Sequence, residues 1–262
     1  MLTRTLIRLI AWAALAYLVL PLVVILGASL TTTSYLAFPP QGITLAWYEK
    51  LLDDPSYVAA FTTSTVLALA ATAAAIVLAI PAALAVARHD FPGKATLSAI
   101  LMSPLVLPHI VLGAALLQFG AHIGLTRSFL ALLIGHTVII TPFVLRSVLA
   151  LLSPEQRSLE EASADLGAGP VQTFFLVVLP QIRPGVVTGG IFAFISSWIN
   201  VELSIFNTTA QLNTIPVKLF NYVQYTIDPT IAAVSAATIL AAVVAIVILD
   251  LTVGLDMLSE PD

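Results

Sequence analysis

Charged residues and cysteine are what this sequence most clearly lacks. Of its 262 residues, 9% are charged and 59% are apolar, and none is cysteine. A soluble globular domain has about 25% charged residues, so this composition excludes an ordinary water-soluble fold. It also excludes a disordered chain, which needs charge and few aliphatic residues. Without cysteine there is no disulfide framework, thiolate metal site or thiol nucleophile. A polytopic membrane protein is the class that remains.

Several functional motifs are also missing. The net charge is −4 and no basic stripe is present, which argues against a nucleic-acid partner. The chain has no GxxxxGK[ST] phosphate loop, no HExxH and no GxSxG, so ATP binding, zinc proteolysis and serine hydrolysis by this chain are not expected. We therefore predict a non-enzyme with no catalytic residue, metal site or bound cofactor. No internal repeat is apparent, which argues against a self-contained inverted-repeat transporter.

Long uncharged stretches predict six membrane-spanning helices, each needing about 20 apolar residues. Helices are expected because a segment in lipid must satisfy its own backbone, and no alternating pattern of a membrane barrel is present. We treat residues 1–262 as one all-α transmembrane domain, with prolines kinking several spans. The predicted spans are residues 9–30, 57–87, 96–120, 128–150, 184–205 and 229–252.

The distribution of basic residues predicts the orientation. With both termini in the cytoplasm, seven of the ten Lys and Arg residues lie in cytoplasmic segments, in agreement with the positive-inside rule. The first apolar run exceeds the length of a signal-peptide core, so we read it as a retained helix. The outer loops 31–56 and 206–228 are rich in aromatic residues, which form either an interfacial belt or a docking surface. A short helix is expected at residues 45–52.

The predicted cytoplasmic loop 153–183 is long enough to be functional. Ser153-Pro154-Glu155 is typical of a helix start, and Gly167 of a helix end, so a helix is expected at residues 155–166. A second helix is expected at residues 171–179, stopping before Pro180. The first helix carries four acids beside an apolar stripe, which suits docking onto another protein. Docking onto lipid headgroups is the alternative, and anionic lipids would repel it. The acids are Glu155, Glu160, Glu161 and Asp165, and the stripe is Leu159, Ala162 and Leu166.

One gapped pattern in this loop is specific. It reads Glu161-Ala162-Ser163, three residues, Gly167, nine residues, Val177, one residue, Leu179-Pro180. This pattern resembles the EAA loop of ABC importer permeases, Glu-Ala-Ala, three residues, Gly, nine residues, Ile, one residue, Leu-Pro. The spacing matches at every step, and only Ser163 and Val177 depart, both conservatively. Segments 42–48, 102–104 and 215–218 with Tyr222 resemble the spermidine/putrescine permease subfamily.

The resemblance implies one permease subunit of a type I importer in a bacterial inner membrane. Its partners would be a second, distinct permease, two cytoplasmic ATPases that bind ATP and Mg, an extracytoplasmic substrate-binding protein and the bilayer. The loop between the fourth and fifth spans would carry the coupling helix, which lies in a groove of the ATPase. The coupling residues would be Glu160, Glu161, Ala162, Asp165 and Gly167, and Leu179 and Pro180 would end the motif.

The backbone of Gly167 and the side chain of Glu161 are each expected to have a specific role in this loop. Gly167 is required if its backbone has a positive φ, because another residue there costs about 1 kcal/mol or more. Glu161 is either an ion-pair partner across the interface or a cap for local backbone donors; we favour the structural role.

Polar residues within the spans are candidates for the solute pathway, because they are costly in a membrane. Asn200 and Glu202 are two residues apart and point about 200° away from each other on a regular helix. Either one of them faces the partner permease, or the fifth span is locally unwound. A lone histidine such as His136 more often bonds to a neighbouring helix. Gly185-xxx-Gly189 resembles the small-residue face of a helix dimer, which is weak evidence for a contact between two permeases. The pathway candidates are Ser103, His109, Asn200 and Glu202.

The predicted function is passage of a small polar solute through an ATP-driven importer. Spermidine/putrescine permeases often carry adjacent acids where this chain has Ile199-Asn200. That departure weakens the case for a polyamine specifically, so the predicted solute is a polyamine or a related amine, an amino-acid derivative, a phosphonate or an organic ion. One alternative is a stand-alone secondary transporter or channel, but the sequence has no intramembrane acid–base pairs for ion coupling. The other is an intramembrane enzyme, but the sequence shows no convergent nucleophile and base and no metal-binding set.

Overall fold

In a computed structural model, which describes residues 2–253, every regular element of those residues is helical. The described chain forms two compact units, one of residues 2–59 and 219–253 and the other of residues 60–218. The predicted all-α class is confirmed.

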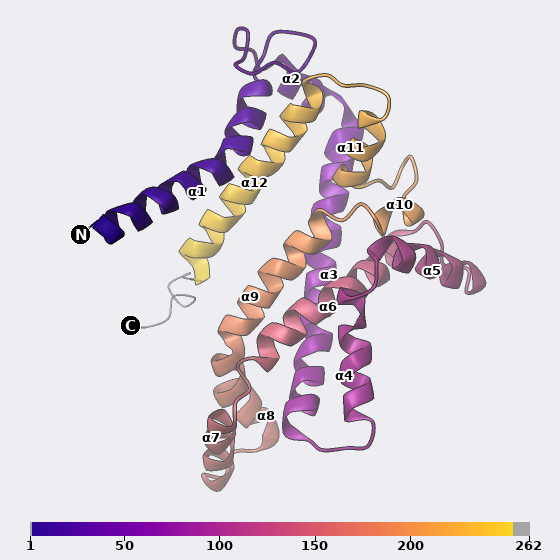
Figure 1. The fold of residues 1–262 in the computed structure, drawn as a ribbon. Coiled ribbons are helices and arrows are strands. Elements are labelled where there is room, and N and C mark those ends of the chain that lie inside the picture. Colours follow the sequence, from indigo (N-terminus) through magenta and orange to yellow (C-terminus); the bar gives the residue numbers. More distant parts are fainter. Residues whose placement is uncertain (1, 254–262) are drawn as a thin grey trace. The chain divides into compact units, whose positions relative to one another are not determined.

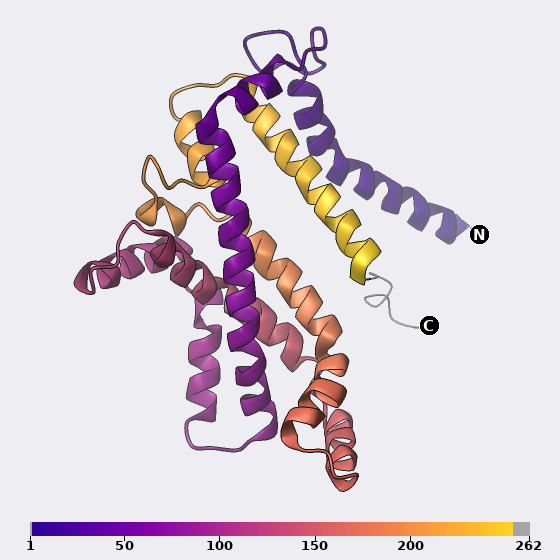
Figure 2. The same ribbon diagram turned by 180° about the vertical axis from the view of Figure 1, so that it is seen from behind.

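The first unit contains two long helices and one short one. α1 (Leu2–Ala28) lies beside α12 (Thr230–Val253), and α2 (Ala46–Asp53) also contacts α12 (Figures 1 and 2). After Arg8, α1 is apolar on all sides, and most of its length is exposed, as expected for a helix surrounded by lipid. The short helix expected at residues 45–52 is α2.

Asp228, just before α12, joins three parts of this unit. Its carboxylate accepts hydrogen bonds from Lys50 Nζ on α2 at 3.2 Å, from Tyr222 Oη at 2.9 Å and from the Thr230 backbone N–H at 2.9 Å. Burial alone would raise the pKa of the Asp228 carboxyl, but the hydrogen bonds from Thr230, Tyr222 and Lys50 together hold the pKa below its ordinary value of 3.8.

We predict that Asp228→Ala lowers the stability of the protein by about 1 kcal/mol, because three donors lose their acceptor. A depressed pKa means that this contribution is present above about pH 4 and is lost as the pH falls through the pKa of the folded state. Midpoints of heat denaturation in detergent test this, with the exposed Asp53→Ala as control. Equal midpoints for the two variants at neutral pH would contradict it.

The second unit is built on three helices that cross one another. The core lies where α3, α6 and α9 meet. On α3, alanines at every fourth position are fully buried in this core. The helices of this unit are α3 (Pro55–Arg88, its start in the first unit), α4 (Lys94–Met102), α5 (His109–His122), α6 (Phe129–Leu149), α7 (Pro154–Asp165), α8 (Pro170–Thr173), α9 (Leu179–Trp198), α10 (Ser204–Asn207) and α11 (Ile215–Val223, its end in the first unit), with short helical turns at Ser103–Leu105 (η1) and Phe174–Val178 (η2).

Within residues 2–253, four helices are long and apolar enough to cross a membrane: Arg4–Ala28, Pro55–Arg88, Phe129–Leu149 and Pro170–Trp198. The helix pair Lys94–Leu105 and His109–His122 passes the same test only when taken together, and its parts meet at 108°, so it is either a broken fifth span or a re-entrant loop. The sequence predicted this segment as one span at 96–120; it is divided because Pro108 disfavours a helical conformation at the residue before it. The apolar helix Thr230–Ala245 is shorter, so the sixth span stays a prediction.

The helix of the fifth predicted span begins earlier than expected. We expected a stop before Pro180, and this was wrong, because the helix runs from Pro170 to Trp198. The physical reason is the π-helical turn η2, in which the Leu179 N–H bonds to Phe174 O, five residues back. Such a wider turn makes room for the ring of Pro180. It also shifts the hydrogen-bond pattern, so the helix continues although proline has no backbone N–H to donate.

Gly185 and Gly189 face α6 of the same chain. A Cβ atom at Gly185 would lie 2.6 Å from Ser147 O, and one at Gly189 would lie 2.7 Å from Val144 Cα. The predicted contact of these glycines with a second permease is therefore corrected: they allow α9 to pack closely on α6.

Candidate functional site

α7 has the defined start and end that the sequence predicts. At its start, the Ser153 backbone N–H donates to Gln156 Oε1 at 3.3 Å. At its end, the Gly167 N–H bonds to Ala164 O at 2.9 Å and the Ala168 N–H to Ser163 O at 3.1 Å. This pair of bonds is a Schellman motif, which requires a left-handed residue. Gly167 supplies it, with φ of 88°.

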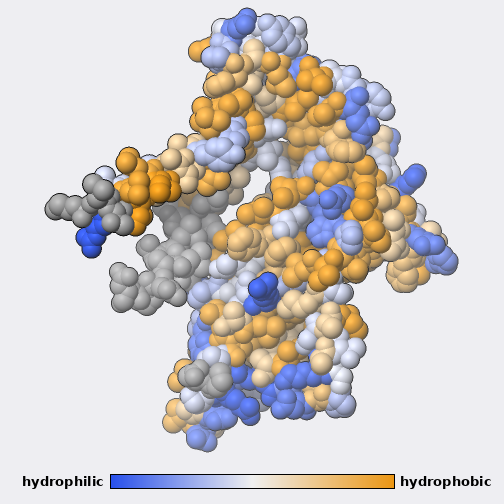
Figure 3. Space-filling view, viewed as in Figure 1, coloured by the Kyte–Doolittle hydropathy of each residue, from blue (hydrophilic) through white to orange (hydrophobic). Residues whose placement is uncertain are grey.

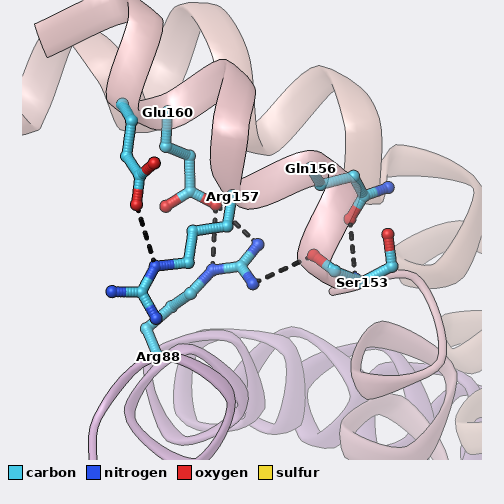
Figure 4. A network of polar contacts seen from close by, with 6 residues as sticks. Arg88, Ser153, Gln156, Arg157 and Glu160 are labelled. Atoms are coloured by element: carbon cyan, nitrogen blue, oxygen red, sulfur yellow. Dashed lines mark hydrogen bonds and ion pairs between the residues drawn. The ribbon is translucent and has the colours of Figure 1, made fainter.

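Arg88, the last residue of α3, holds α7 at two points (Figure 4). Its Nε and Nη2 donate to Glu160 Oε1 at 3.0 and 2.6 Å, and its Nη1 donates to Ser153 O at 3.2 Å. The side chains of Arg88 and Glu160 are only 11% and 21% exposed. The predicted coupling residue Glu160 is thus turned inward as an anchor.

The other predicted coupling residues lie on the exposed side of α7. Glu161, Ala162 and Asp165 are exposed, and Leu166 is 90% exposed. Glu161 Oε1 accepts a hydrogen bond from Arg157 Nε at 3.2 Å on the same helix. In the part of the chain that the structure describes, its carboxylate bonds to this side chain rather than to a backbone donor of the kind that we favoured.

Polar residues gather at the end of this unit that carries α7 (Figure 3). An open hollow of about 590 Å³ lies between α3, α7 and α8. Ser163, where the EAA pattern has Ala, bonds through Oγ to Thr173 Oγ1 at 3.1 Å, so it ties α7 to α8. The walls of the hollow include Leu84, Arg88, Arg157, Glu161, Pro170 and Phe174.

The structure brings two of the four pathway candidates together. His109 Nδ1, at the start of α5, lies 3.6 Å from Glu202 Oε2, with side chains 31% and 60% exposed. Asn200 is buried, and its Oδ1 accepts the Leu203 N–H at 2.9 Å. Ser103 Oγ donates to Ile100 O at 2.8 Å within its own segment.

α9 ends at Trp198, so the segment with Asn200 and Glu202 is unwound, which was one of the two alternatives. His136 of α6 holds this segment from both sides. Its Nδ1 lies 2.8 Å from Ser197 Oγ and its Nε2 2.9 Å from Ser204 Oγ, and its side chain is 1% exposed. His136 therefore has the structural role that the sequence predicts for a lone histidine, and it fixes the turn that presents Glu202.

Comparison with known proteins identifies the family. Residues 75–255 match the model of the binding-protein-dependent transport system inner membrane component. The chain belongs to this family. It is therefore an ABC importer permease, a non-catalytic, multi-pass membrane subunit.

Relatives of this permease place it in the polyamine subfamily. It is 34% identical over 209 residues to the putrescine transport system permease protein PotI of Escherichia coli K12, covering 77% of this chain and 74% of the relative. It is 27% identical over 233 residues to the spermidine/putrescine transport system permease protein PotC of Haemophilus influenzae, covering 89% and 90%. The predicted subfamily is confirmed.

A third relative and one solved structure are also similar to this permease. The permease is 30% identical over 209 residues to the sulfoquinovosyl glycerol transport system permease protein SmoH of Agrobacterium fabrum, covering 77% and 73%. A crystallised amino acid ABC transporter, solved with histidines, superposes with a TM-score of 0.58 at 17% identity, covering 80% of this permease and 98% of that chain. That structure shows the fold alone.

Sequence reasoning missed the residues that fix α7 in this permease. The sequence identified Arg88 only as a positive charge beside a span. Its place at the end of an apolar helix also indicates a long side chain that can reach polar partners outside the membrane. The contact of Arg88 with Ser153 and Glu160 crosses 65 and 72 positions in the chain, and no local pattern predicts such a pairing.

Proposed function

We propose that this permease passes a small polar solute across the membrane and is coupled through α7 and α8 to partner ATPases. The observation that carries the proposal is the form of α7: a short helix, ended by a left-handed Gly167, with acids and Leu166 on its exposed side. A short stiff element of this kind suits a mechanical contact, because it moves as a body. The EAA spacing supports the same assignment.

The family description supports partner chains of two kinds: ATPases and a substrate-binding protein. We propose that two ATPases bind ATP and Mg in the cytoplasm, that the second permease is a distinct chain and that the binding protein docks outside. Residues 1–262 would form one transmembrane domain with six spans. Both termini would be cytoplasmic in a bacterial inner membrane, which the distribution of Lys and Arg supports.

We propose that the solute passes the His109–Glu202 pair. An exposed carboxylate beside a weak base suits a polar or cationic solute better than an apolar one. The relatives are named for putrescine, spermidine and sulfoquinovosyl glycerol, so we assign the solute to the polyamines, related amines, amino-acid derivatives or organic ions.

Purification of the tagged chain from its native host in mild detergent, followed by mass spectrometry, tests the coupling. We expect an ABC ATPase and a second permease with the natural chain, and loss of the ATPase with Glu161→Arg, because the reversed charge disrupts the exposed face of α7. Glu49→Arg makes the same change at an exposed residue of α2 and should keep the ATPase. Recovery of the natural chain alone would favour a stand-alone transporter and overturn the proposal.

A further inference from the structure

We infer that Arg88 is a positioning residue that transmits movement of α7 to α3, in parallel with the covalent path from α8 through η2 into α9. The inference rests on the proposed coupling role of α7. It assigns a function to contacts that lie outside the EAA pattern, between the end of one spanning helix and two points of the loop helix.

The two contact points fix the orientation of α7 on α3 as well as its position. Arg88 bonds to Ser153, which precedes the first residue of α7, and to Glu160 farther along the same helix. Seven residues of helix separate these points by roughly 10 Å. Contact at a single point would let α7 pivot on α3, whereas three bonds from one planar guanidinium to two points fix both the distance and the tilt of α7.

The environment of this pair makes it stiffer than the other ion pairs nearby. Arg88 and Glu160 are mostly shielded from solvent, while the Lys94–Asp90 pair in the α3–α4 turn has side chains 35% and 99% exposed. Exposed pairs of that kind contribute little. Charge-assisted bonds of 2.6 to 3.2 Å in a shielded site resist separation more strongly.

α3 is able to carry the movement onward. It is one unbroken helix from Pro55 to Arg88. The alanines that line one face within the second unit are fully buried against α6 and α9: Ala71, Ala75, Ala79 and Ala83. A packed interface has discrete arrangements and is not continuously deformable, so a displacement at the Arg88 end shifts α3 as a body from one packing position on α6 to another. The covalent path, by contrast, runs through the π-helical turn η2, where the hydrogen-bond pattern changes.

The test uses the assembled complex with its ATPases. The chain has no cysteine, so spin labels can be placed at two exposed positions, Leu78→Cys on α3 and Leu130→Cys on α6. The distance between the labels is measured with and without ATP and vanadate. We expect an ATP-dependent change in the natural background, its loss with Arg88→Gln or Glu160→Gln, and a partial change with Arg88→Lys, which keeps the charge but not the fork.

Two further variants complete the design. Lys94→Gln, which removes the exposed pair at the same end, should keep the full distance change. The exchange Arg88→Glu with Glu160→Arg should restore part of it. An unaltered change in both Arg88→Gln and Glu160→Gln would overturn the inference, as would loss of the ATPase from these variants, because the residues would then serve assembly. Failure of the ATPase to purify with the natural chain would instead refute the proposed function.

Discussion

Alanine at Gly189 is expected to destabilise the permease by about 1–3 kcal/mol, as overpacking in a close-packed core does. The new Cβ would lie 2.7 Å from Val144 Cα and 3.2 Å from Phe143 O of α6. Both are backbone atoms, so no side-chain rotation relieves the contact and α9 must move away from α6. A larger residue such as leucine is expected to prevent the correct fold.

Gly190, the next residue, provides the matched control. Its Cβ would meet only Ile76 Cδ1 at 3.5 Å and Thr72 Cγ2 at 3.9 Å, which are ordinary contacts. Gly190→Ala is therefore expected to be tolerated. Yield of monodisperse protein and the midpoint of heat denaturation distinguish the two variants. If the two alanine variants behave alike, the close approach of α9 to α6 at Gly189 is not as described.

Valine at Gly167 is expected to leave the chain inserted in the membrane but to reduce the ATPase recovered with it. Apart from its two chain neighbours, no atom of residues 2–253 lies within 4 Å of a Cβ built there, so the effect is not a clash. It comes from the backbone, because φ of 88° costs a residue other than glycine about 1–2 kcal/mol. That energy corresponds to roughly a fivefold to thirtyfold loss of the competent loop conformation.

The neighbouring Gly169 separates this backbone effect from an effect of added bulk. It is equally open but has φ of −73°, so Gly169→Val should keep most of the ATPase. Gly167→Asn should fall between the natural chain and Gly167→Val, because asparagine tolerates the left-handed region. Equal recovery with valine at either position would show that the left-handed turn is not needed for the contact.

The elements of this fold that depend on local sequence were predictable. Hydropathy located the apolar helices, and the Ser153-Pro154 start and the Gly167 end located α7 within one or two residues, because capping is a short-range property. The unwinding near Asn200 was one of two stated alternatives, since two polar residues so close together do not share one helix face. The EAA spacing led to the family that the comparisons show.

The elements that depend on distant contacts were not predictable. Whether Gly185 and Gly189 pack within the chain or against a partner depends on which helix lies next to them in the folded protein. The spacing of small residues is the same in both cases, so it does not distinguish them. The passage of the helix through Pro180 depends on the π-helical turn before it. The inward turn of Glu160 toward Arg88, and the outward position of Glu161, depend on where α3 ends in space.

Cross-linking from Leu166 tests the central claim, that α7 is the contact with an ATPase, most directly. A thiol-specific photo-cross-linker attached to Leu166→Cys would report what touches this 90% exposed side chain, and the chain supplies no competing cysteine. Ile123→Cys, just after α5 and 58% exposed, is the control. We expect a cross-linked ABC ATPase from position 166 and none from position 123. An ATPase adduct from position 123 alone, or from neither position in a complex that contains the ATPase, would contradict the account.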